Sequence, residues 1–586
     1  MTILRARFYA PALLAAIGLF AFMPCVANDF VDWDDYGFVK ENPHIRDLSY
    51  TSLLRMVTGF HQGVWHPLTW LSHAADRSLW GLNPSAHHLV SVVLHALNGA
   101  LVFLVCLMLQ DAWKERNSRE AVPTELSVIA ASFTAGLLFA VHPLRVESVA
   151  WISGRKDLLC ALFFLSALLS YVGYVCRREV SPARGRRWYA SAVVFHGLAV
   201  LSKPTAVVLP LVLLLLDYYP LYRMDPSVFL RRVVEKAPFW VIGGIGVVMN
   251  MAAKWGESIP LSYVPASVRI MNAFHSVVAY IVQTAAPLTL IPLYPMDLST
   301  DHFGPEYVLA AAMVTAVTGL CLFSALRGRR LWAGVCLYYL ITLSPSLGLF
   351  MSFRHCAADR YTYLPSVGLC LLMGLGVGRL WDVLGGRRHR LIGRAALCAA
   401  VMTAAFGCLI KSRDQMAVWR NTETLWLHVV KHARPVPDIA YFALGKVYES
   451  RDDFTRALEA YRKALSLNPG GARIKGRIAV VLARTGKTAE ARELALGLIE
   501  ADPRQPDAYV TLAGIEGSMG RYDEAVRSLE QALRLEPEYP PALGLLIVAH
   551  VRRNDLGRAR YYYGLYTEKG FTVPREIEET LSRNSE

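Results

Sequence analysis

Residues 157–178, DLLCALFFLSALLSYVGYVCRR, indicate the fold class, because an apolar run of this length can span a lipid bilayer. Such runs recur along the chain at 9–27, 86–109, 125–141, 157–176, 188–202, 204–221, 237–253, 305–326, 331–351, 362–380 and 395–411. The composition agrees: 54% of the residues are hydrophobic and 18% are charged, whereas soluble domains carry about a quarter charged residues. The sequence predicts an all-α, polytopic membrane helix bundle with about eleven spans, and it excludes a purely soluble, fibrous or disordered protein.

Basic residues orient these spans, because positively charged loops stay in the cytoplasm. They gather in six places: Arg5 and Arg7; Lys114, Arg116 and Arg119; Arg177, Arg178, Arg184, Arg186 and Arg187; Arg223, Arg231, Arg232 and Lys236; Arg327, Arg329 and Arg330; Arg387, Arg388, Arg390 and Arg394. All six can face the cytoplasm only if 269–294, which contains Pro287 and Pro292, does not cross completely. We expect a re-entrant or interfacial helix pair there. The N-terminus is then inside and everything after residue 411 is outside.

Residues 1–27 also have the charged start and apolar centre of a cleaved signal peptide. The many spans that follow favour an anchoring helix instead. In both cases residue 28 lies outside the cytoplasm.

A 34-residue repeat organises the C-terminal part of the chain. Two residue types recur at this interval: Pro435, Pro469, Pro503 and Pro537, and Ala457, Ala491, Ala525 and Ala559. Small residues at helix contacts and prolines at helix ends, with this period, are typical of tetratricopeptide repeats. We expect a linker and half repeat over 412–437, then an extracytoplasmic α-solenoid of tetratricopeptide repeats over 438–586, with about three full repeats and a truncated last one.

Net charge and cysteines exclude other classes of protein. The formal charge is +14, but no basic stripe interleaved with exposed aromatics is present, so we expect no nucleic-acid partner. All ten cysteines precede residue 412 and none forms a CxxC pair, which argues against a disulfide framework or a zinc site.

An acidic doublet, Asp34 and Asp35, follows the first apolar run on the external side. A carboxylate there is suited to deprotonate an acceptor hydroxyl, while its neighbour orients the acceptor or holds a cation. Asp34 or Asp35 is therefore our candidate general base, and the pair is a candidate site for a divalent cation. A solvated loop with turn-forming aspartates is the structural alternative.

Charged residues also mark other external span ends. The stretch 142–160, HPLRVESVAWISGRKDLLC, contains His142, Glu147, Arg155 and Asp157, and the later segments add Lys203, Arg354 and Arg360. Because the positive-inside rule disfavours cations here, they favour an anionic ligand, and arginine offers phosphate a bidentate fork. A membrane-bound polyprenyl phosphate carrying a sugar fits this pattern, with the cations stabilising the departing phosphate. The alternative is snorkelling side chains in mutual salt bridges.

Histidines are frequent between residues 60 and 95, and His73 and Asp76 have the i, i+3 spacing of metal ligands. Helical histidines are more often hydrogen-bonded structural groups, so we expect no metal there. An amphipathic helix on the bilayer surface is the better interpretation of residues 50–75.

At these motifs the chain resembles the bacterial relatives of the transmembrane and tetratricopeptide-repeat O-mannosyltransferases, within the GT-C superfamily. The matching stretches are VDWDD (31–35), HPLRVESVAWISGRKDLL (142–159), ADRYTYLPSVG (358–368) and WHPLTWLSHAADRSLWGLNPSAHHLVSVVLHALN (65–98). The resemblance implies a GT-C-like transmembrane glycosyltransferase domain over 1–411 and inverting transfer of a sugar, inferred to be mannose from eukaryotic relatives, to a protein hydroxyl. It makes Asp34 or Asp35 the base. It makes His142, Glu147, Arg155 and Asp157 site-forming residues and has Arg360 and Tyr363 support the donor pocket. Lys203, chosen as a cation at an external span end, completes the predicted donor-binding set.

The resemblance also implies the partners and location: a polyprenyl-phosphate sugar, an acceptor protein bound by the repeats, and the lipid bilayer of a bacterial inner (plasma) membrane, with the repeats on the periplasmic or extracellular side. The short repeat array departs from the family and puts the choice of acceptor in doubt. Two other classes stay open, namely a non-catalytic membrane scaffold and an oligosaccharide ligase or polymerase of the cell envelope. A scaffold has no use for the acidic doublet. A ligase usually carries its key residues in a long late loop.

Overall fold

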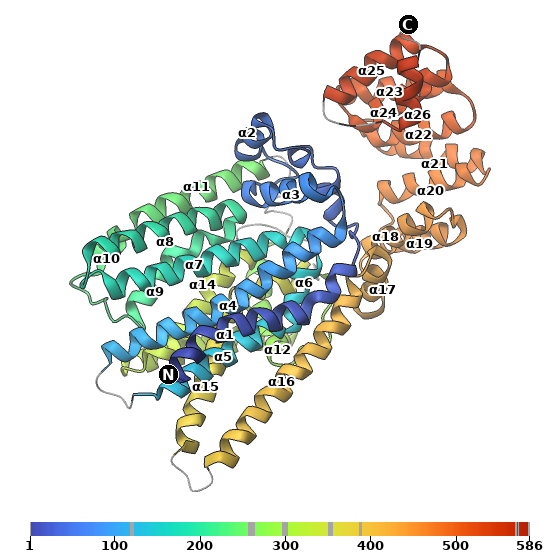
Figure 1. Ribbon diagram of the computed structural model, residues 1–586. Helices are drawn as coiled ribbons and strands as arrows, with labels where there is room; N and C mark the ends of the chain where they lie inside the picture. Colours follow the sequence, from blue (N-terminus) through green and yellow to red (C-terminus); the bar gives the residue numbers. More distant parts are fainter. Residues whose placement is uncertain are drawn as a thin grey trace. The chain divides into compact units, whose positions relative to one another are not determined.

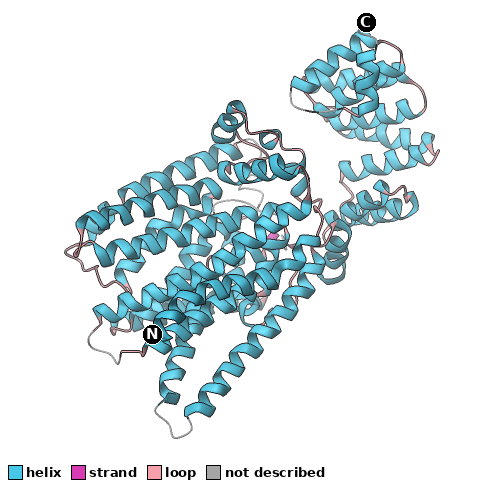
Figure 2. Ribbon diagram, in the orientation of Figure 1, coloured by secondary structure: helices cyan, strands magenta, loops and turns pink. Residues whose placement is uncertain are grey.

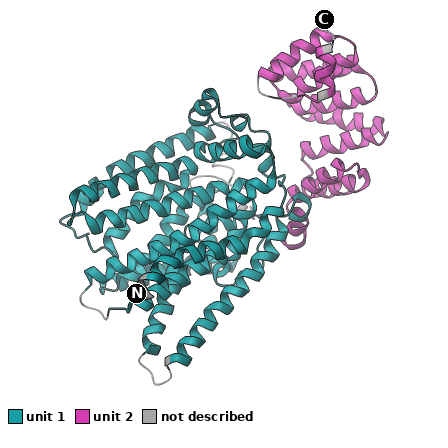
Figure 3. Ribbon diagram, viewed as in Figure 1, with its two compact units in different colours: residues 1–425 teal, residues 426–586 magenta. Residues whose placement is uncertain are grey.

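The computed structural model describes residues 2–117, 122–255, 264–295, 303–349, 355–385, 390–568, 571 and 573–583. Helices dominate it (Figures 1 and 2). Within the described residues, the named strands are β1 (Tyr294–Pro295) and β2 (His355–Ala357), which pair antiparallel with Tyr294 opposite Ala357. The chain divides into two compact units, Met1–Leu425 and Trp426–Glu586 (Figure 3). The predicted all-α class is confirmed.

The first unit is the membrane unit. Its helices are α1 (Thr2–Phe22), α2 (Tyr50–Thr58), α3 (Pro67–Trp80), α4 (Pro84–Arg116), α5 (Glu125–Val141), α6 (Val146–Ala150), α7 (Arg155–Arg177), α8 (Pro182–Ser202), α9 (Leu209–Tyr218), α10 (Phe229–Glu235), α11 (Ala237–Lys254), α12 (Ala266–Ala285), α13 (Pro305–Leu326), α14 (Arg330–Leu343), α15 (Ser366–Gly385) and α16 (Arg390–Val418). Figure 1 shows α7, α8 and α11 packed side by side.

Seven helices among the described residues are long and apolar enough to cross a membrane: Arg5–Ala27, Pro84–Arg116, Ile152–Arg177, Ala237–Lys254, Pro305–Leu326, Ser366–Gly385 and Leu391–Val418. An eighth span results if α5 and α6, bent by 56°, count as one. The expected count of eleven is therefore not confirmed. The remaining expected spans fall on α8, α9 and α14, which are helical but too short or too polar to pass this test. The expected helix pair at 269–294 is a single helix, α12, followed by irregular chain.

Close packing of α15 on α5 depends on two glycines spaced four residues apart. A Cβ atom at Gly374 would lie 2.2 Å from the carbonyl oxygen of Ala131, and one at Gly378 would lie 2.9 Å from that of Ser127. Small residues at this spacing let membrane helices approach closely. The contact holds the start of α15, and the segment before it, beside the C-terminal end of α5.

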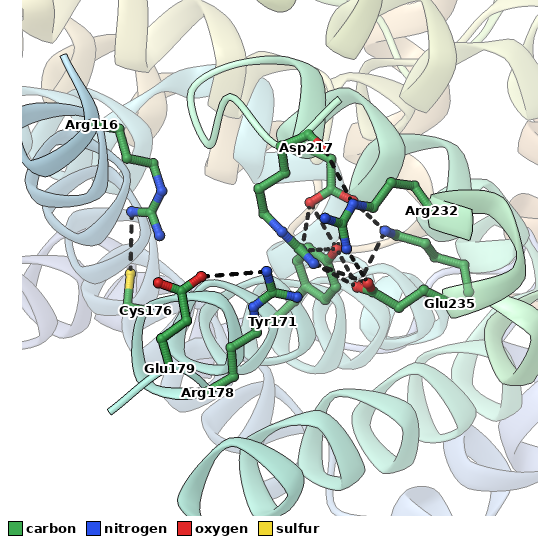
Figure 4. A network of polar contacts seen from close by, with 10 residues as sticks. Arg116, Tyr171, Cys176, Arg178, Glu179, Asp217, Arg232 and Glu235 are labelled. Carbon is green, nitrogen blue, oxygen red and sulfur yellow. Dashed lines mark hydrogen bonds and ion pairs between the residues drawn. The ribbon is translucent and has the colours of Figure 1, made fainter. Parts of the chain in front are cut away.

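A buried ionic network joins α7, α9 and the segment 223–236 (Figure 4). Asp217 is fully buried and accepts hydrogen bonds from the Tyr171 hydroxyl at 2.8 and 2.9 Å, from Arg223 at 2.8 Å and from Lys236. Glu235 binds Arg223 at 2.9 Å and Arg232 at 2.8 Å. Basic loop residues thus neutralise two acids inside the bundle and fix the loop to it.

The second unit consists of the repeats, preceded by α17 (Thr422–His432), which begins within the first unit. Four helix pairs start 34 residues apart: α18 (Asp438–Ser450) with α19 (Phe454–Leu467), α20 (Ala472–Arg484) with α21 (Thr488–Ala501), α22 (Pro506–Ser518) with α23 (Tyr522–Leu535), and α24 (Pro540–Arg552) with α25 (Leu556–Glu568). α26 (Arg575–Arg583) follows them. The last repeat, expected to be truncated, has both of its helices. The alanines at 457, 491, 525 and 559 are all buried, as the packing argument requires.

Candidate functional site

The loop after the first span is tied to the end of α16 and the start of α17. α1 closes with the tight turn Met23–Ala27, after which three groups of the loop donate hydrogen bonds to segment 416–422. The bonds are Asn28 Nδ2 to the Met416 carbonyl at 3.3 Å, Asp29 N to the Arg420 carbonyl at 2.9 Å, and Asp32 N to the Thr422 hydroxyl at 2.9 Å. The acidic doublet therefore lies on a fixed backbone.

Asp35 is a fully buried carboxylate whose oxygens are both occupied by protein donors. Oδ1 accepts the Ser153 amide at 2.9 Å and its hydroxyl at 2.6 Å, while Oδ2 accepts the Val31 amide at 3.0 Å. Burial raises the pKa of Asp35 to about 6, against the opposing effect of these hydrogen bonds. This side chain joins the loop to the segment before α7, and it has no open oxygen for a substrate.

Asp34 differs from its neighbour in both exposure and bonding. It is half-buried, and within the part of the chain that the structure describes its carboxylate forms no hydrogen bond or ion pair. Its negative charge acts on the nearby ammonium group of Lys156. Of the two aspartates, Asp34 is therefore the one with a carboxylate free to take a proton.

A row of alternating cations and aromatic rings lies beside this aspartate. The Lys156 ammonium lies 4.9 Å from the centre of the Trp151 ring, and the Arg360 guanidinium lies 5.2 Å from the same ring. The Tyr361 ring in turn lies 4.8 Å from Arg360 and 5.6 Å from Lys203. We call Lys156, Trp151, Arg360, Tyr361 and Lys203 the cation–aromatic row. Three segments that are distant in sequence, at 151–156, 203 and 360–361, assemble it.

Two of the three cations in the row have a carboxylate partner. Arg360 forms an ion pair with Glu147 and also donates its backbone amide to the same carboxylate at 2.7 Å. Lys203 binds Asp157 at 2.5 Å. Lys156 has no carboxylate within ion-pair distance among the described residues. The row therefore carries one surplus positive charge, at the end nearest Asp34.

The segment that carries Arg360 is also held from the opposite side. Asp359 is buried and accepts a hydrogen bond from the Tyr294 hydroxyl at 2.8 Å. Burial, and then the charge of Glu147, raises the pKa of Asp359 well above its usual value. Asp359 therefore does not serve as the partner of Arg360.

Arg155 lies apart from the row, although it precedes Lys156 directly. It is fully buried, forms an ion pair with Asp76, and donates hydrogen bonds to the Ser72 hydroxyl at 3.0 Å and the His87 carbonyl at 2.6 Å. Successive residues of a helix point in directions about 100° apart, which separates the two side chains. The structure does not bring Arg155 to the other predicted site residues.

His142 and Tyr363 lie beneath the row rather than in it. His142 Nε2 is 2.9 Å from the Thr284 carbonyl, and Tyr363 is buried with its hydroxyl 2.7 Å from His95 Nδ1 and 3.2 Å from Asn98 Nδ2. His142 thus joins the end of α5 to α12, and Tyr363 joins the segment before α15 to α4. Of the predicted donor residues, Glu147, Asp157, Lys203 and Arg360 are brought together, and His142 and Tyr363 support them.

One group of described residues could hold a metal ion. His73, Asp76 and His87 are buried, and their ligand-type atoms all lie within 4.8 Å of one another. Burial lowers the pKa of His73 well below its usual value, so the ring is neutral, as ligation requires. The Arg155 guanidinium, however, already neutralises Asp76. At the doublet, Asp34 alone offers open oxygens, and a divalent cation there stays a prediction.

Comparisons with known proteins agree with the sequence motifs. Two models of the tetratricopeptide repeat match residues 442–506 and 518–567. The chain is 24% identical to the human protein O-mannosyl-transferase TMTC2 over 78% of its own length and 62% of that protein. It is 25% identical to mouse TMTC4 over 78% and 66% of the two chains, and 23% identical to human TMTC3 over 82% and 54%. The predicted resemblance to this family is confirmed, and the chain spans less than two thirds of these relatives' length.

Solved structures also match, over smaller parts. A tetratricopeptide-repeat protein of Thermus thermophilus is 19% identical, with a TM-score of 0.22, and the match covers 25% of this chain and 80% of that one. The type IV pilus biogenesis factor PilW is 21% identical, with a TM-score of 0.24, and covers 31% of this chain.

Three members of the row, Lys156, Trp151 and Tyr361, are not among the residues that the sequence predicts for the site. A signal existed, because both aromatics lie inside the motifs that carry the family resemblance. Nothing in the sequence, however, places a ring of one motif between the cations of two others.

Proposed function

We propose that this protein is a membrane glycosyltransferase that moves a sugar, mannose as the first candidate, from a polyprenyl-phosphate donor to a hydroxyl group of an extracytoplasmic protein. Similarity to protein O-mannosyl-transferases over about four fifths of the chain supports the reaction class. The helices long enough to span a membrane support an integral membrane location.

The observation that carries the proposal is the open carboxylate of Asp34 beside the surplus cation of the cation–aromatic row. A scaffold or an acyl transferase does not need this pairing. Glycosyl transfer from a phosphate needs both groups, the carboxylate as a base and the cation beside the phosphate. Asp34 accepts the proton of the acceptor hydroxyl as the hydroxyl oxygen attacks C1 of the sugar. The bond from C1 to the phosphate oxygen breaks on the opposite face, and the electron pair leaves with the phosphate, which inverts the anomeric centre.

The departing phosphate gains one negative charge, and the row is suited to stabilise it. Lys156 has no carboxylate within ion-pair distance among the residues that the structure describes, so its ammonium group can face the phosphate directly. Arg360 is held by Glu147 and two aromatic rings, so its remaining donors are oriented before the substrate arrives. Fixed cations aimed at developing charge stabilise a transition state more than mobile ones, because they need no reorganisation.

The remaining residues have positioning roles in this proposal. Asp35 fixes the backbone that presents Asp34, and Asp157 orients Lys203. Arg155, His142 and Tyr363 hold the segments that carry the row. The repeats bind the acceptor protein, since stacked repeats form an extended surface for partners. The positive-inside pattern favours an extracytoplasmic location for the repeats and Asp34, and the resemblance to bacterial members of the family implies a bacterial plasma membrane.

The test is the intact mass of extracytoplasmic proteins from cells with the chain, without it, and with its Asp34→Asn variant at matched abundance. Hexose-sized mass increments should disappear without the chain and should not return with the variant. A variant that restores them would point to a scaffold that recruits another transferase. Increments that persist in the absence of the chain would refute the proposal.

A further inference from the structure

A cavity of about 1000 Å³ lies inside the membrane unit, away from Asp34. It runs between α4, α5, α9, α14 and α15, and along α15 it extends from Val367 to beyond Arg379. Twelve residues of helix correspond to about 18 Å, so the cavity is a slot parallel to the helices.

The two ends of the slot differ in chemistry. Its deep part is lined by apolar side chains of α4, α9, α14 and α15, such as Val105, Leu216, Val335 and Leu371. At the other end stand four arginines: Arg329, Arg330, Arg379 and Arg394. None of these four has a carboxylate within ion-pair distance among the residues that the structure describes, and Asp382 is the one acid in the lining.

The basic end belongs to the face of the membrane opposite the candidate site. α4 shows this directly: Ser91 contacts Arg155 beside the site, and Trp113 of the same helix lines the slot. The 22 residues between them correspond to about 33 Å, the thickness of a bilayer core. α15 has the same polarity, since Tyr363 precedes its start and Arg379 lies toward its end. The slot is thus not the place where Asp34 would act.

We propose that this slot binds a phosphate-bearing anionic lipid, with its hydrocarbon chain in the apolar part and its phosphate against Arg329 and Arg379. Basic pockets between membrane helices on the cytoplasmic side are suited to anionic head groups. Arg330 stacks on the rings of Tyr218 and Tyr222 and shapes the rim. α14 and α15 touch where Tyr338 lies against Gly368, and the lipid would occupy the remaining space that the slot leaves between them. This inference does not depend on the proposed transferase activity.

The test measures the lipid retained by the full-length protein in native mass spectrometry, after exchange into detergent with one added lipid. Two kinds of variant change the two ends of the slot. Arg329→Gln with Arg379→Gln removes the phosphate ligands, and Arg327→Gln, a neighbouring arginine outside the lining, is the matched control. Gly376→Phe fills the slot, because a Cβ there meets no atom within 4 Å. Gly319→Phe has the same free space on α13 and serves as its control.

We expect wild type and both controls to retain one anionic lipid, and both slot variants to retain at least tenfold less at unchanged thermal stability. Phosphatidylglycerol, polyprenyl phosphate and phosphatidylcholine are the three lipids compared. Retention of only one anionic lipid identifies the source of the phosphate, and retention of both supports the shared chemistry. Equal retention of phosphatidylcholine, or equal retention by slot variants and controls, would overturn the proposal. If one slot variant unfolds, the other still decides the test, because the two variants change different ends of the slot.

Discussion

The two adjacent aspartates should respond in opposite ways to the same substitution. Asp34→Asn leaves the fold unchanged, because the side chain is half-buried and bonds to nothing that the structure describes. Such a change usually alters stability by less than about 0.5 kcal/mol. It removes the base, however, and a positioned base contributes about 10²–10⁴-fold to the rate. We expect kcat to fall by that factor.

Asp35→Asn should retain most of the activity. The pKa of about 6 means that the ionised carboxylate costs about 3 kcal/mol of folding free energy at neutral pH, relative to an unperturbed aspartate. The neutral amide avoids that cost, but its NH2 group replaces one acceptor oxygen and faces a buried N–H donor, which costs about 1–3 kcal/mol. The two changes nearly cancel, so the loop and the position of Asp34 are kept. We expect kcat within about tenfold of wild type.

The assay is single-turnover transfer in proteoliposomes from a polyprenyl-phosphate sugar to an acceptor protein, with thermal unfolding measured on each variant. Asp29→Asn is the matched control, because Asp29 is an exposed acid of the same loop. The assignment is refuted if Asp34→Asn keeps wild-type kcat while a folded Asp35→Asn loses a hundredfold or more.

Four further outcomes are expected. Lys156→Met should lower kcat/KM for the donor by about 10- to 100-fold at unchanged stability, because a charge-assisted hydrogen bond contributes about 1.5–3 kcal/mol; unchanged donor kinetics would remove Lys156 from the site. Asp217→Ala should destabilise the membrane unit by about 3–5 kcal/mol in unfolding measurements, because it leaves buried cations uncompensated; a loss below 1 kcal/mol would contradict the network's role. Protection of the doublet loop from hydrogen exchange should fall as pH rises from about 4 to about 6, because folding favours the protonated form of Asp35. Asp35→Asn should abolish this dependence of protection on pH. Protection that rises over the same range would show that Asp35 is stabilised as an anion. Thr51→Cys and Ser466→Cys, both at exposed positions, should react alike with a membrane-impermeant reagent; opposite labelling would place the repeats and the doublet on different sides.

The sequence predicted those elements of the fold that depend on a local pattern of residues. The 34-residue period located the repeat helices, and the apolar runs located the helices of the membrane unit. The count of eleven spans is not confirmed, because α8, α9 and α14 are helical without being both long and apolar. The sequence pointed to the doublet but could not tell which of its two aspartates is open to a substrate. The burial of Asp35 depends on Ser153, which lies 118 residues away in sequence. The position of Arg155 outside the row was also hidden in the sequence, because its partner Asp76 lies far away along the chain.

The hydrogen bonds that fix the doublet loop set the order in which the site can assemble. Asn28 and Asp32 bond to residues 388 and 390 positions later in the chain. A chain that leaves the ribosome from its N-terminus therefore holds the doublet loop through Asp35 and Ser153, without these two bonds, until nearly all of the membrane unit has been made. Truncated or incompletely inserted chains lack the bonds that hold the base in place. The long sequence separation thus restricts the fully anchored doublet loop to chains whose membrane unit is complete.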